Sequence, residues 1–391
     1  MSKTARTNFP DYKNIDLRII SPDFQSDLTD LIINLDSLRR LRLHGTTPLQ
    51  IFFQIKNIFH ILESIGSARI EGNRTTVIEY FDQKLERDTP KSDSYKEIEN
   101  MEKALELIDE NISLSPINRA FVSELHKIAV DGLIEEGSKS PGIYRDCPVE
   151  VRGSKLVPPP PGLVPSLMDE LFSFILKEDA PKYDLIKIAL SHHRFVWIHP
   201  FDNGNGRTGR LLTYALLVKF GFCVNLARII NPAAIFCCDR DEYNKTLSRA
   251  DRGDDEGFLV WIKYMLTGLQ RELKKTDRLA DYDYLKKNIL CPAVAFSLEK
   301  NIINSIEEKI LSLAIEKEEI KNSDIRTVHP AKYPAYTSHL IEGLLRKKYL
   351  VPVLSKKRIY TINFKDNKLV RGIIKALAQE GFLPENSERF T

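Results

Sequence analysis

Apolar residues recur at every third or fourth position through most of the first 280 residues of this 391-residue chain. This period is that of an amphipathic α-helix, which buries one face and exposes the other. Pro, Gly and Asp breaks separate the periodic stretches, so the sequence predicts a mostly helical fold. The pattern is clearest from position 49 onward, where the apolar face consists of Ile51, Ile55, Ile58, Leu62 and Ile65.

Composition narrows the class of protein further. With 42% hydrophobic residues and a net charge of only +3, the chain is globular, and its overall charge implies no polyanionic partner. The five cysteines are odd in number and lack C-x-x-C spacing, which argues against a disulfide framework and a zinc site. The sequence shows neither a signal peptide nor the ~20 consecutive apolar residues of a membrane span. We therefore expect a cytoplasmic protein that contacts no membrane.

The stretch IHPFDNGNGRTGR, residues 198–210, lies between two helical patterns. The small residues of DNGNG allow backbone N–H groups to converge on an anion, and the following helix directs its N-terminal dipole to the same point. Arg207 and Arg210 share a helix face there, where two positive charges are unfavourable unless an anion binds. His199 precedes the loop and could act as a general base near neutral pH. The stretch therefore predicts a phosphate site beside a base.

Residues 198–210 also allow two other interpretations, a dinucleotide-binding turn and a helix-capping loop. Gly204, Gly206 and Gly209 formally match the dinucleotide-binding pattern G-x-G-x-x-G. That pattern requires a preceding strand and an acidic residue about 20 positions later, whereas a helical pattern precedes these glycines, so we reject it. A helix-capping loop with solvated arginines and a core histidine explains each residue singly, but the combination favours the phosphate site.

These residues resemble the motif H-x-F-x-[DE]-G-N-G-R-x-x-R of the Fic (Fido) family. The resemblance implies an all-helical core that transfers AMP from ATP to a Ser, Thr or Tyr hydroxyl of a target protein. It also implies that the histidine is the base and that the glycine loop and both arginines bind the triphosphate. The matching residues are His199, Phe201, Gly204, Asn205, Gly206, Arg207 and Arg210.

One motif position departs from the family pattern. The acidic residue that holds Mg²⁺ in the family is Asn203 here, and Asp202 lies one place earlier. Because Mg²⁺ prefers carboxylates together with substrate phosphates and water, the substitution leaves metal affinity and the identity of the donor nucleotide open. Asp202 would substitute for the missing carboxylate only if the loop rotates.

A second motif, SIGSARIEGN at residues 64–73, ends the helical pattern that begins near position 49. Ser67 and Glu71 share a helix face, and Gly72 is a C-cap signal. A carboxylate in the last turn opposes the helix dipole, so a cationic partner explains it better than solvent does. The motif resembles the family's inhibitory sequence [ST]-x-x-x-E-[GN]. This implies that Glu71 pairs with Arg210, occupies the γ-phosphate position and keeps the enzyme off; whether Glu71 also supports removal of AMP is left open.

Residues 147–157 interrupt the helical pattern, because two valines alternate with charged residues before a Gly-Ser turn and four prolines. This alternation predicts a short β-hairpin. Together with the preceding Gly142 to Arg145, GIYR, it resembles the family's target-docking flap, whose strand edge binds a target segment through main-chain hydrogen bonds. An ordinary exposed hairpin is an equal alternative.

Further along the chain, Tyr243 and Asn244 resemble a family position with paired tyrosines near the adenine. The resemblance implies that Tyr243 faces the nucleotide base. The alternative is a tyrosine that is half-buried in helix packing.

From about residue 305 the pattern is helix, short helix, longer helix and two strand-like runs, which is typical of a winged helix-turn-helix. Residues 326–375 hold twelve Lys and Arg against two acidic residues, which suggests contact with nucleic-acid phosphates. Only Ser338 and His339 on the longer helix could read bases. Dimerisation or target docking through this domain is an alternative of nearly equal weight.

The sequence thus predicts four segments: an N-terminal helical region (1–105) with an inhibitory helix (49–73), a Fic-type core with a hairpin flap (106–280), a linker (281–304) and a winged-helix domain (305–391). The function hypothesis is an ATP-dependent protein adenylyltransferase that Glu71 holds off and that uses Mg²⁺. The alternatives are another nucleotidyl or phosphoryl transfer on the same fold, and a nucleotide-sensing DNA-binding regulator. Homodimer formation is left open.

Overall fold

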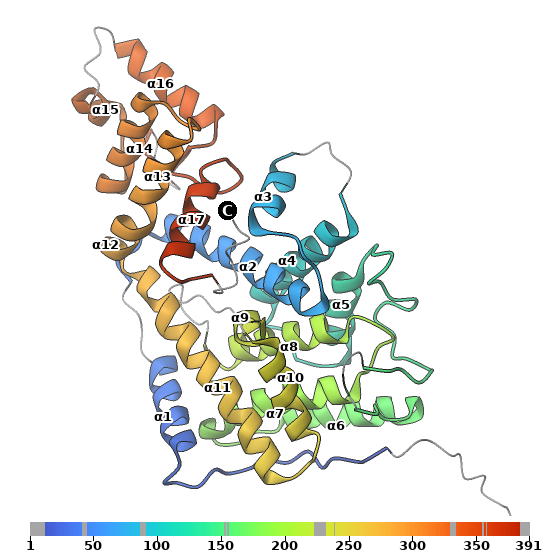
Figure 1. The fold of residues 1–391 in the computed structure, drawn as a ribbon. Coiled ribbons are helices and arrows are strands. Elements are labelled where there is room, and N and C mark those ends of the chain that lie inside the picture. Colours follow the sequence, from blue (N-terminus) through green and yellow to red (C-terminus); the bar gives the residue numbers. More distant parts are fainter. Residues whose placement is uncertain are drawn as a thin grey trace, which may run out of the picture.

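The computed structural model describes residues 12–40, 45–86, 91–151, 154, 156–222, 232–237, 239–328, 334–353, 356 and 358–383. The prediction of a mostly helical chain is confirmed (Figure 1). None of the described helices is both long and apolar enough to cross a membrane. The first helices are α1 (Asp27–Arg40), α2 (Leu49–Glu71), α3 (Val77–Leu85), α4 (Asp93–Asn111) and α5 (Arg119–Val130).

The middle of the chain forms the group of helices that carries the motif at residues 198–210. Helix α7 ends directly before the motif histidine, and α8 begins inside the glycine loop, so the two helices flank the loop. The helices are α6 (Val164–Leu176), α7 (Asp184–Ile198), α8 (Asn205–Lys219), α9 (Pro232–Cys237), α10 (Arg240–Ala250) and α11 (Asp255–Asp277), and the 3₁₀ turns are η1 (Pro161–Leu163), η2 (Pro181–Tyr183) and η3 (Arg278–Ala280).

The C-terminal part contains the sheet of the described residues, in which two strands pair antiparallel with Leu350 opposite Ile362. The predicted order of helix, short helix, longer helix and two strands occurs, and the assignment to a winged helix-turn-helix stays a prediction. Its elements are α12 (Tyr282–Leu285), a π-helical turn η4 (Lys286–Leu290), α13 (Cys291–Glu299), α14 (Ser305–Lys317), α15 (Asn322–Val328), α16 (Pro334–Arg346), β1 (Leu350–Pro352), β2 (Tyr360–Ile362) and α17 (Val370–Gln379).

In two connecting segments the described secondary structure differs from the expected one. The segment 281–304, expected as a linker, folds into α12, η4 and α13, because Leu285, Ile289 and Leu290 are buried in a core. The described residues of 147–157 contain no strand. The segment turns where Ser154 N donates to Val151 O, and part of the predicted hairpin turn, including Gly153, lies outside the described residues.

The buried residues form two hydrophobic clusters that meet at α2. The first cluster contains the apolar faces of α4 to α8, α10 and α11. The second joins α2 and α3 to the C-terminal elements from α12 to α17. Helix α2 also packs against α4, α8 and α9, and it crosses the middle of the molecule in Figure 1. The apolar face predicted for α2 is confirmed as buried.

Part of the positive charge of the C-terminal segment is neutralised within the chain. Lys347 pairs with Glu307 at 2.6 Å, and Lys356 pairs with Glu319 at 2.7 Å. Arg371 of α17 pairs with Asp82 of α3 at 2.6 Å, so this cation faces another helix. These pairs reduce the charge that would remain for nucleic-acid phosphates.

Gln54 connects α2 to the C-terminal strand β2. Its Nε2 donates to Ile362 O at 3.1 Å, and its Oε1 accepts from Phe364 N at 2.8 Å. The side chain is only 8% exposed, so water cannot replace either bond. One buried amide therefore satisfies two backbone groups of the C-terminal part.

We expect Gln54→Leu to lower the free energy of unfolding by about 2–4 kcal/mol, because it leaves a buried N–H and a buried C=O unpaired. Gln50→Leu is the matched control. Gln50 makes a single hydrogen bond to the backbone, from Nε2 to Pro352 O at 3.1 Å, and this bond is exposed to solvent. We expect the control to lose less than about 1 kcal/mol. Urea denaturation followed by circular dichroism measures both, and equal losses would contradict the role assigned to Gln54.

Candidate functional site

The motif histidine caps α7 in a conformation that is uncommon for a residue with a side chain. His199 has φ 52° and ψ 60°, which lies in the left-handed region. Its Nδ1 lies 3.1 Å from Val196 O, and because a carbonyl only accepts, Nδ1 carries the proton and Nε2 keeps its lone pair. Burial lowers the pKa of His199 to about 4, and the nearby charge of Arg145 adds to this against the Val196 carbonyl. The imidazole is therefore neutral at pH 7 and able to accept a proton.

The glycine loop needs its glycines for two different reasons. Gly204 has φ 71°, and a Cβ there would lie 2.7 Å from Val130 Cγ1. A Cβ on Gly206 would lie 2.2 Å from Glu71 Oε1. Asn205 closes the turn, since its Oδ1 accepts from Phe201 N at 2.8 Å and its Nδ2 donates to Phe201 O at 2.9 Å. The first turn of α8 is thereby open to an anion, and the carboxylate of Glu71 lies against it.

Arg210 holds the end of α2. Its Nε donates to Ser67 Oγ at 2.7 Å, and its NH2 group donates to Ser67 O at 3.0 Å and to Glu71 Oε1 at 2.7 Å. The arginine side chain is 1% exposed and the glutamate side chain 31%. Burial opposes the charge of Glu71, but the guanidinium outweighs it and holds the pKa of Glu71 below its usual range. The structure thus brings Ser67, Glu71 and Arg210 together.

Arg207 is bound differently, although it lies one helical turn from Arg210. Its guanidinium donates to Ala129 O at 3.3 Å and to Glu136 O at 2.6 Å. It also lies 3.4 Å from the carboxylate of Glu97 on α4. The NH1 and NH2 groups of Arg207 thus bind protein partners, so Arg207 fastens α8 to α4 and α5.

Glu97 also belongs to this region and the sequence carries no signal for it, whereas Asn73 ends the motif SIGSARIEGN. Gly72 has φ 110° and turns the chain after α2. The next residue, Asn73, donates through Nδ2 to Glu97 Oε2 and to Ser94 O, both at 2.8 Å. Because Glu97 lies beside Arg207 as well, one carboxylate connects the end of α2 to the first turn of α8.

His126 of α5 also contacts the glycine loop, and this residue was not identified from the sequence. Its ring stacks on Phe201 with the centroids 3.7 Å apart. Its Nδ1 accepts from Gly142 N at 2.8 Å, so its Nε2 carries the proton and donates to Asn203 O at 3.0 Å. Burial lowers the pKa of His126 to about 4, so the neutral tautomer persists at pH 7.

Asp202 and Asn203, the two residues expected to hold Mg²⁺, form hydrogen bonds within the protein. Asp202 accepts from Ser138 Oγ at 2.5 Å and from Lys139 N at 2.8 Å. Asn203 donates through Nδ2 to Gly137 O at 3.1 Å, and its Oδ1 accepts from Gly204 N at 2.7 Å. In the described part of the chain, no group of three or more His, Cys, Asp and Glu could hold a metal ion. This donor set does not fit a protein-held Mg²⁺.

The structure places Tyr243 and Asn244 in different surroundings. Tyr243 is 4% exposed, and its hydroxyl lies 3.0 Å from Nε2 of His192, whose Nδ1 lies 2.7 Å from Thr213 Oγ1. Asn244 is exposed. The amphipathic period of α10 turns position 243 into the core beside Arg210, where burial raises the pKa of the tyrosine hydroxyl. Tyr243 therefore lies beside the arginine, and its contact with a nucleotide base stays a prediction.

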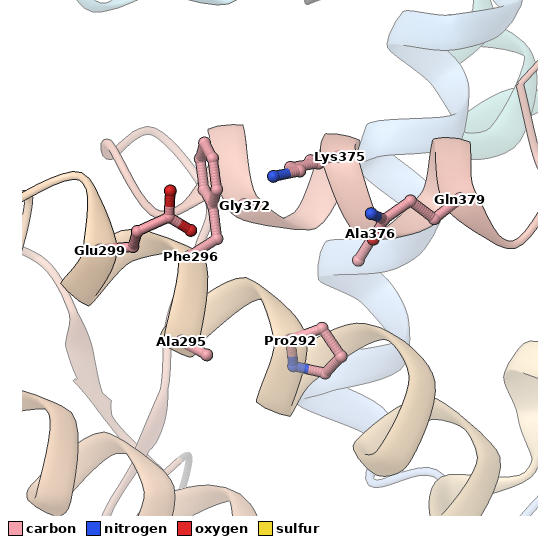
Figure 2. Close-up of a pocket in the computed structure, with 8 residues that line it drawn as sticks. All are labelled: Pro292, Ala295, Phe296, Glu299, Gly372, Lys375, Ala376 and Gln379. Carbon is pink, nitrogen blue, oxygen red and sulfur yellow. The ribbon is translucent and has the colours of Figure 1, made fainter.

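A separate pocket of about 270 Å³ lies between α13 and α17 (Figure 2). Its lining includes Phe296, with Lys375 Nζ 4.4 Å from the ring centroid, and the carboxylate of Glu299. None of the motif residues lines it. The candidate site is therefore the junction of α2, α7 and α8.

Comparisons with known proteins find similarity to one family. Residues 116–217 match the model of the Fic/DOC family. A protein adenylyltransferase Fic from Nematostella vectensis is 33% identical over 159 residues, which are 38% of this chain and 35% of the relative. A protein adenylyltransferase Fic from Drosophila virilis is 31% identical over 253 residues, 63% of this chain and 46% of the relative. The chain thus spans less than half the length of these two relatives.

A solved structure shares the fold over most of the chain. The crystal structure of a Fic family protein from Desulfovibrio desulfuricans G20 superposes with a TM-score of 0.53 at 18% identity. The match covers 89% of this chain and 98% of that one. This likeness concerns the fold, and the match of residues 116–217 to the Fic/DOC model agrees with the family that the motif at residues 198–210 resembles.

The contact between Glu71 and Arg210 makes stability depend on pH in a definite direction. Because the folded pKa of Glu71 lies below its unfolded value of about 4.3, the contact stabilises the protein above that pH and is lost as pH falls through the folded pKa. We expect Glu71→Gln to unfold about 1.5–3 kcal/mol more easily at pH 7, and we expect the difference from wild type to shrink as the pH falls below about 4.3. Urea denaturation over a series of pH values measures this, and a difference that is independent of pH would contradict it.

Proposed function

We propose that this chain is a protein adenylyltransferase that Glu71 holds off and that transfers AMP from ATP to a Ser, Thr or Tyr hydroxyl of a target protein. The observation that carries the proposal is the position of the Glu71 carboxylate at the N-terminus of α8, against Gly206 and on Arg210. The Glu71 carboxylate thus occupies the anion site at the first turn of α8, and the glycine loop separates this site from the neutral His199. The Fic/DOC match and the names of the relatives support the choice of reaction.

The residues of the chain can perform the transfer in a single displacement. His199 Nε2 accepts the hydroxyl proton of the target while the hydroxyl oxygen attacks the α-phosphorus of ATP. A new P–O bond forms, the bond from the α-phosphorus to the pyrophosphate oxygen breaks, and pyrophosphate leaves. The N–H groups of the first turn of α8 and the guanidinium of Arg210 stabilise the departing negative charge. No step in this scheme uses a metal ligand from the chain.

The same geometry accounts for the inactive state. While Glu71 holds Arg210, a γ-phosphate at this place would meet a carboxylate instead of a free guanidinium, and like charges repel. ATP would then bind with its phosphates displaced from the position that presents the α-phosphorus to His199. Movement of the end of α2 would expose Arg210 and permit the productive pose.

Two rival functions follow from particular residues. Another nucleotide donor or a phosphoryl transfer is the first rival, because Asp202 and Asn203 are engaged within the loop. A nucleotide sensor that regulates DNA binding is the second, and it needs the basic C-terminal segment to act as a winged helix. A sensor would bind ATP without transferring any part of it.

The proposal also includes the expected cytoplasmic location and the expected use of Mg²⁺. A cytoplasmic location agrees with the free thiols of Cys147 and Cys291. Mg²⁺ would reach the site with the phosphates of ATP, since the loop offers it no free carboxylate. Removal of AMP through Glu71, formation of a homodimer and contact with DNA are separate properties that the transfer reaction does not require.

The decisive test incubates wild type, Glu71→Gly and Glu71→Gly/His199→Ala with ATP and Mg²⁺, and follows self-modification by intact mass spectrometry. We expect Glu71→Gly to add AMP at least about tenfold faster than wild type, which corresponds to roughly 1.4 kcal/mol of relieved repulsion. The added His199→Ala change should slow this by about 10²- to 10⁴-fold, because the general base is lost.

Glu135→Gly is the matched control, because it removes an exposed carboxylate from the loop after α5. It should behave like wild type. Parallel reactions with the other nucleoside triphosphates identify the donor and address the first rival. ATP binding without any mass addition in the Glu71→Gly variant would contradict the proposal and favour the sensor.

A further inference from the structure

Arg145 binds the backbone of His199, the general base proposed above. In the sequence it belongs to the stretch GIYR, which resembles part of a docking flap. Its side chain is 5% exposed. The guanidinium makes four hydrogen bonds, and each one ends on a backbone carbonyl oxygen. The acceptors are His199 O at 2.7 Å, Cys147 O at 3.0 Å, Pro159 O at 2.5 Å and Ile198 O at 3.4 Å.

These four acceptors belong to two different parts of the site. Ile198 and His199 form the turn at the end of α7, where His199 is held at φ 52°. A left-handed residue with a side chain costs about 1–2 kcal/mol and persists only where its surroundings hold it. The backbone of Arg145 adds a further bond, since its N–H donates to Pro200 O at 2.9 Å. Residue 145 thus fixes three successive carbonyls, those of residues 198, 199 and 200.

The other two acceptors bracket the segment that the sequence predicted as a hairpin. Cys147 O lies at its beginning and Pro159 O shortly after its end, and both accept from the same guanidinium. One planar group with five N–H donors therefore sets the distance between the two ends and their position relative to His199. A lysine has three donors on a single nitrogen and cannot reach four carbonyls in these directions.

We infer that Arg145 is a positioning residue that holds Cys147 and Pro159 against the His199 turn, so that the imidazole stays aligned with a target hydroxyl. The inference rests on the proposed function for the identity of the reaction. The contacts themselves are independent of it. Loss of the guanidinium should impair the alignment of base and target while the anion site at α8 stays intact, because Arg145 makes no contact with Arg210 or Gly206 among the hydrogen bonds of the described residues.

The test compares Arg145→Lys with Arg119→Lys, both in the Glu71→Gly background. Arg119 is the matched control because it is exposed and lies over the Tyr144 ring at 4.5 Å, one residue from Arg145. Hydrogen exchange measured by mass spectrometry reports on peptides covering residues 143–149 and 196–203. Calorimetric titration with ATP measures nucleotide affinity, and intact mass measures the rate of AMP addition.

We expect Arg145→Lys to speed exchange at least tenfold in both peptides and to slow AMP addition at least tenfold, while ATP affinity changes less than threefold. Arg119→Lys should leave all three unchanged. Unchanged exchange in Arg145→Lys would overturn the inference, and so would a loss of ATP affinity as large as the loss of rate. If the Glu71→Gly parent adds no AMP at all, the proposed function fails, whereas the exchange data still decide the role of Arg145.

A measurement on the unsubstituted protein covers the case in which Arg145→Lys does not fold. If the guanidinium joins the two parts, the amides of Arg145, His199 and Phe201 open together and exchange with the same free energy in wild type. Exchange rates that differ more than tenfold after correction for intrinsic rates would show that the two parts open separately, and this would overturn the inference.

Discussion

The contact of Glu71 with Arg210 and the first turn of α8 is the interaction on which the site depends. A carboxylate in the last turn of a helix opposes the dipole of its own helix. Here the end of α2 meets the beginning of α8, so the partial positive charge of the second helix and the guanidinium of Arg210 compensate for that cost. The conflict on α2 is therefore resolved only while the two helix ends stay together.

The placement of α2 connects this contact to the rest of the molecule. The helix is buried along most of its length, contacts α4, α8 and α9, and belongs to the same hydrophobic cluster as the C-terminal elements. Its end is also attached to α4 through Asn73 and Glu97, and the same Glu97 lies beside Arg207. The turns before Glu71 are therefore held by two cores, and the chain directly after it is held by α4.

The sequence predicts a feature well when the residues that form it lie close together along the chain, and poorly when they lie far apart. The periodicity of α2 and the loop between α7 and α8 are local patterns, so both could be read directly. The pairing of Glu71 with Arg210 spans 139 positions and came from a family resemblance. His126 and Arg145 bind backbone carbonyls far along the chain, and such contacts leave no mark in residue spacing. The burial of Tyr243 depends on its neighbours in α10 and on the helices around it, which the local motif does not show.

The most direct measurement of the central claim is a crystal structure of the Glu71→Gly protein with a nonhydrolysable ATP analogue. The account predicts that the terminal phosphate lies at the first turn of α8 within hydrogen-bond distance of the Arg210 guanidinium, and that the α-phosphorus faces His199 Nε2. An analogue bound elsewhere, with Arg210 still held by Ser67 and the helix end empty of phosphate, would contradict it.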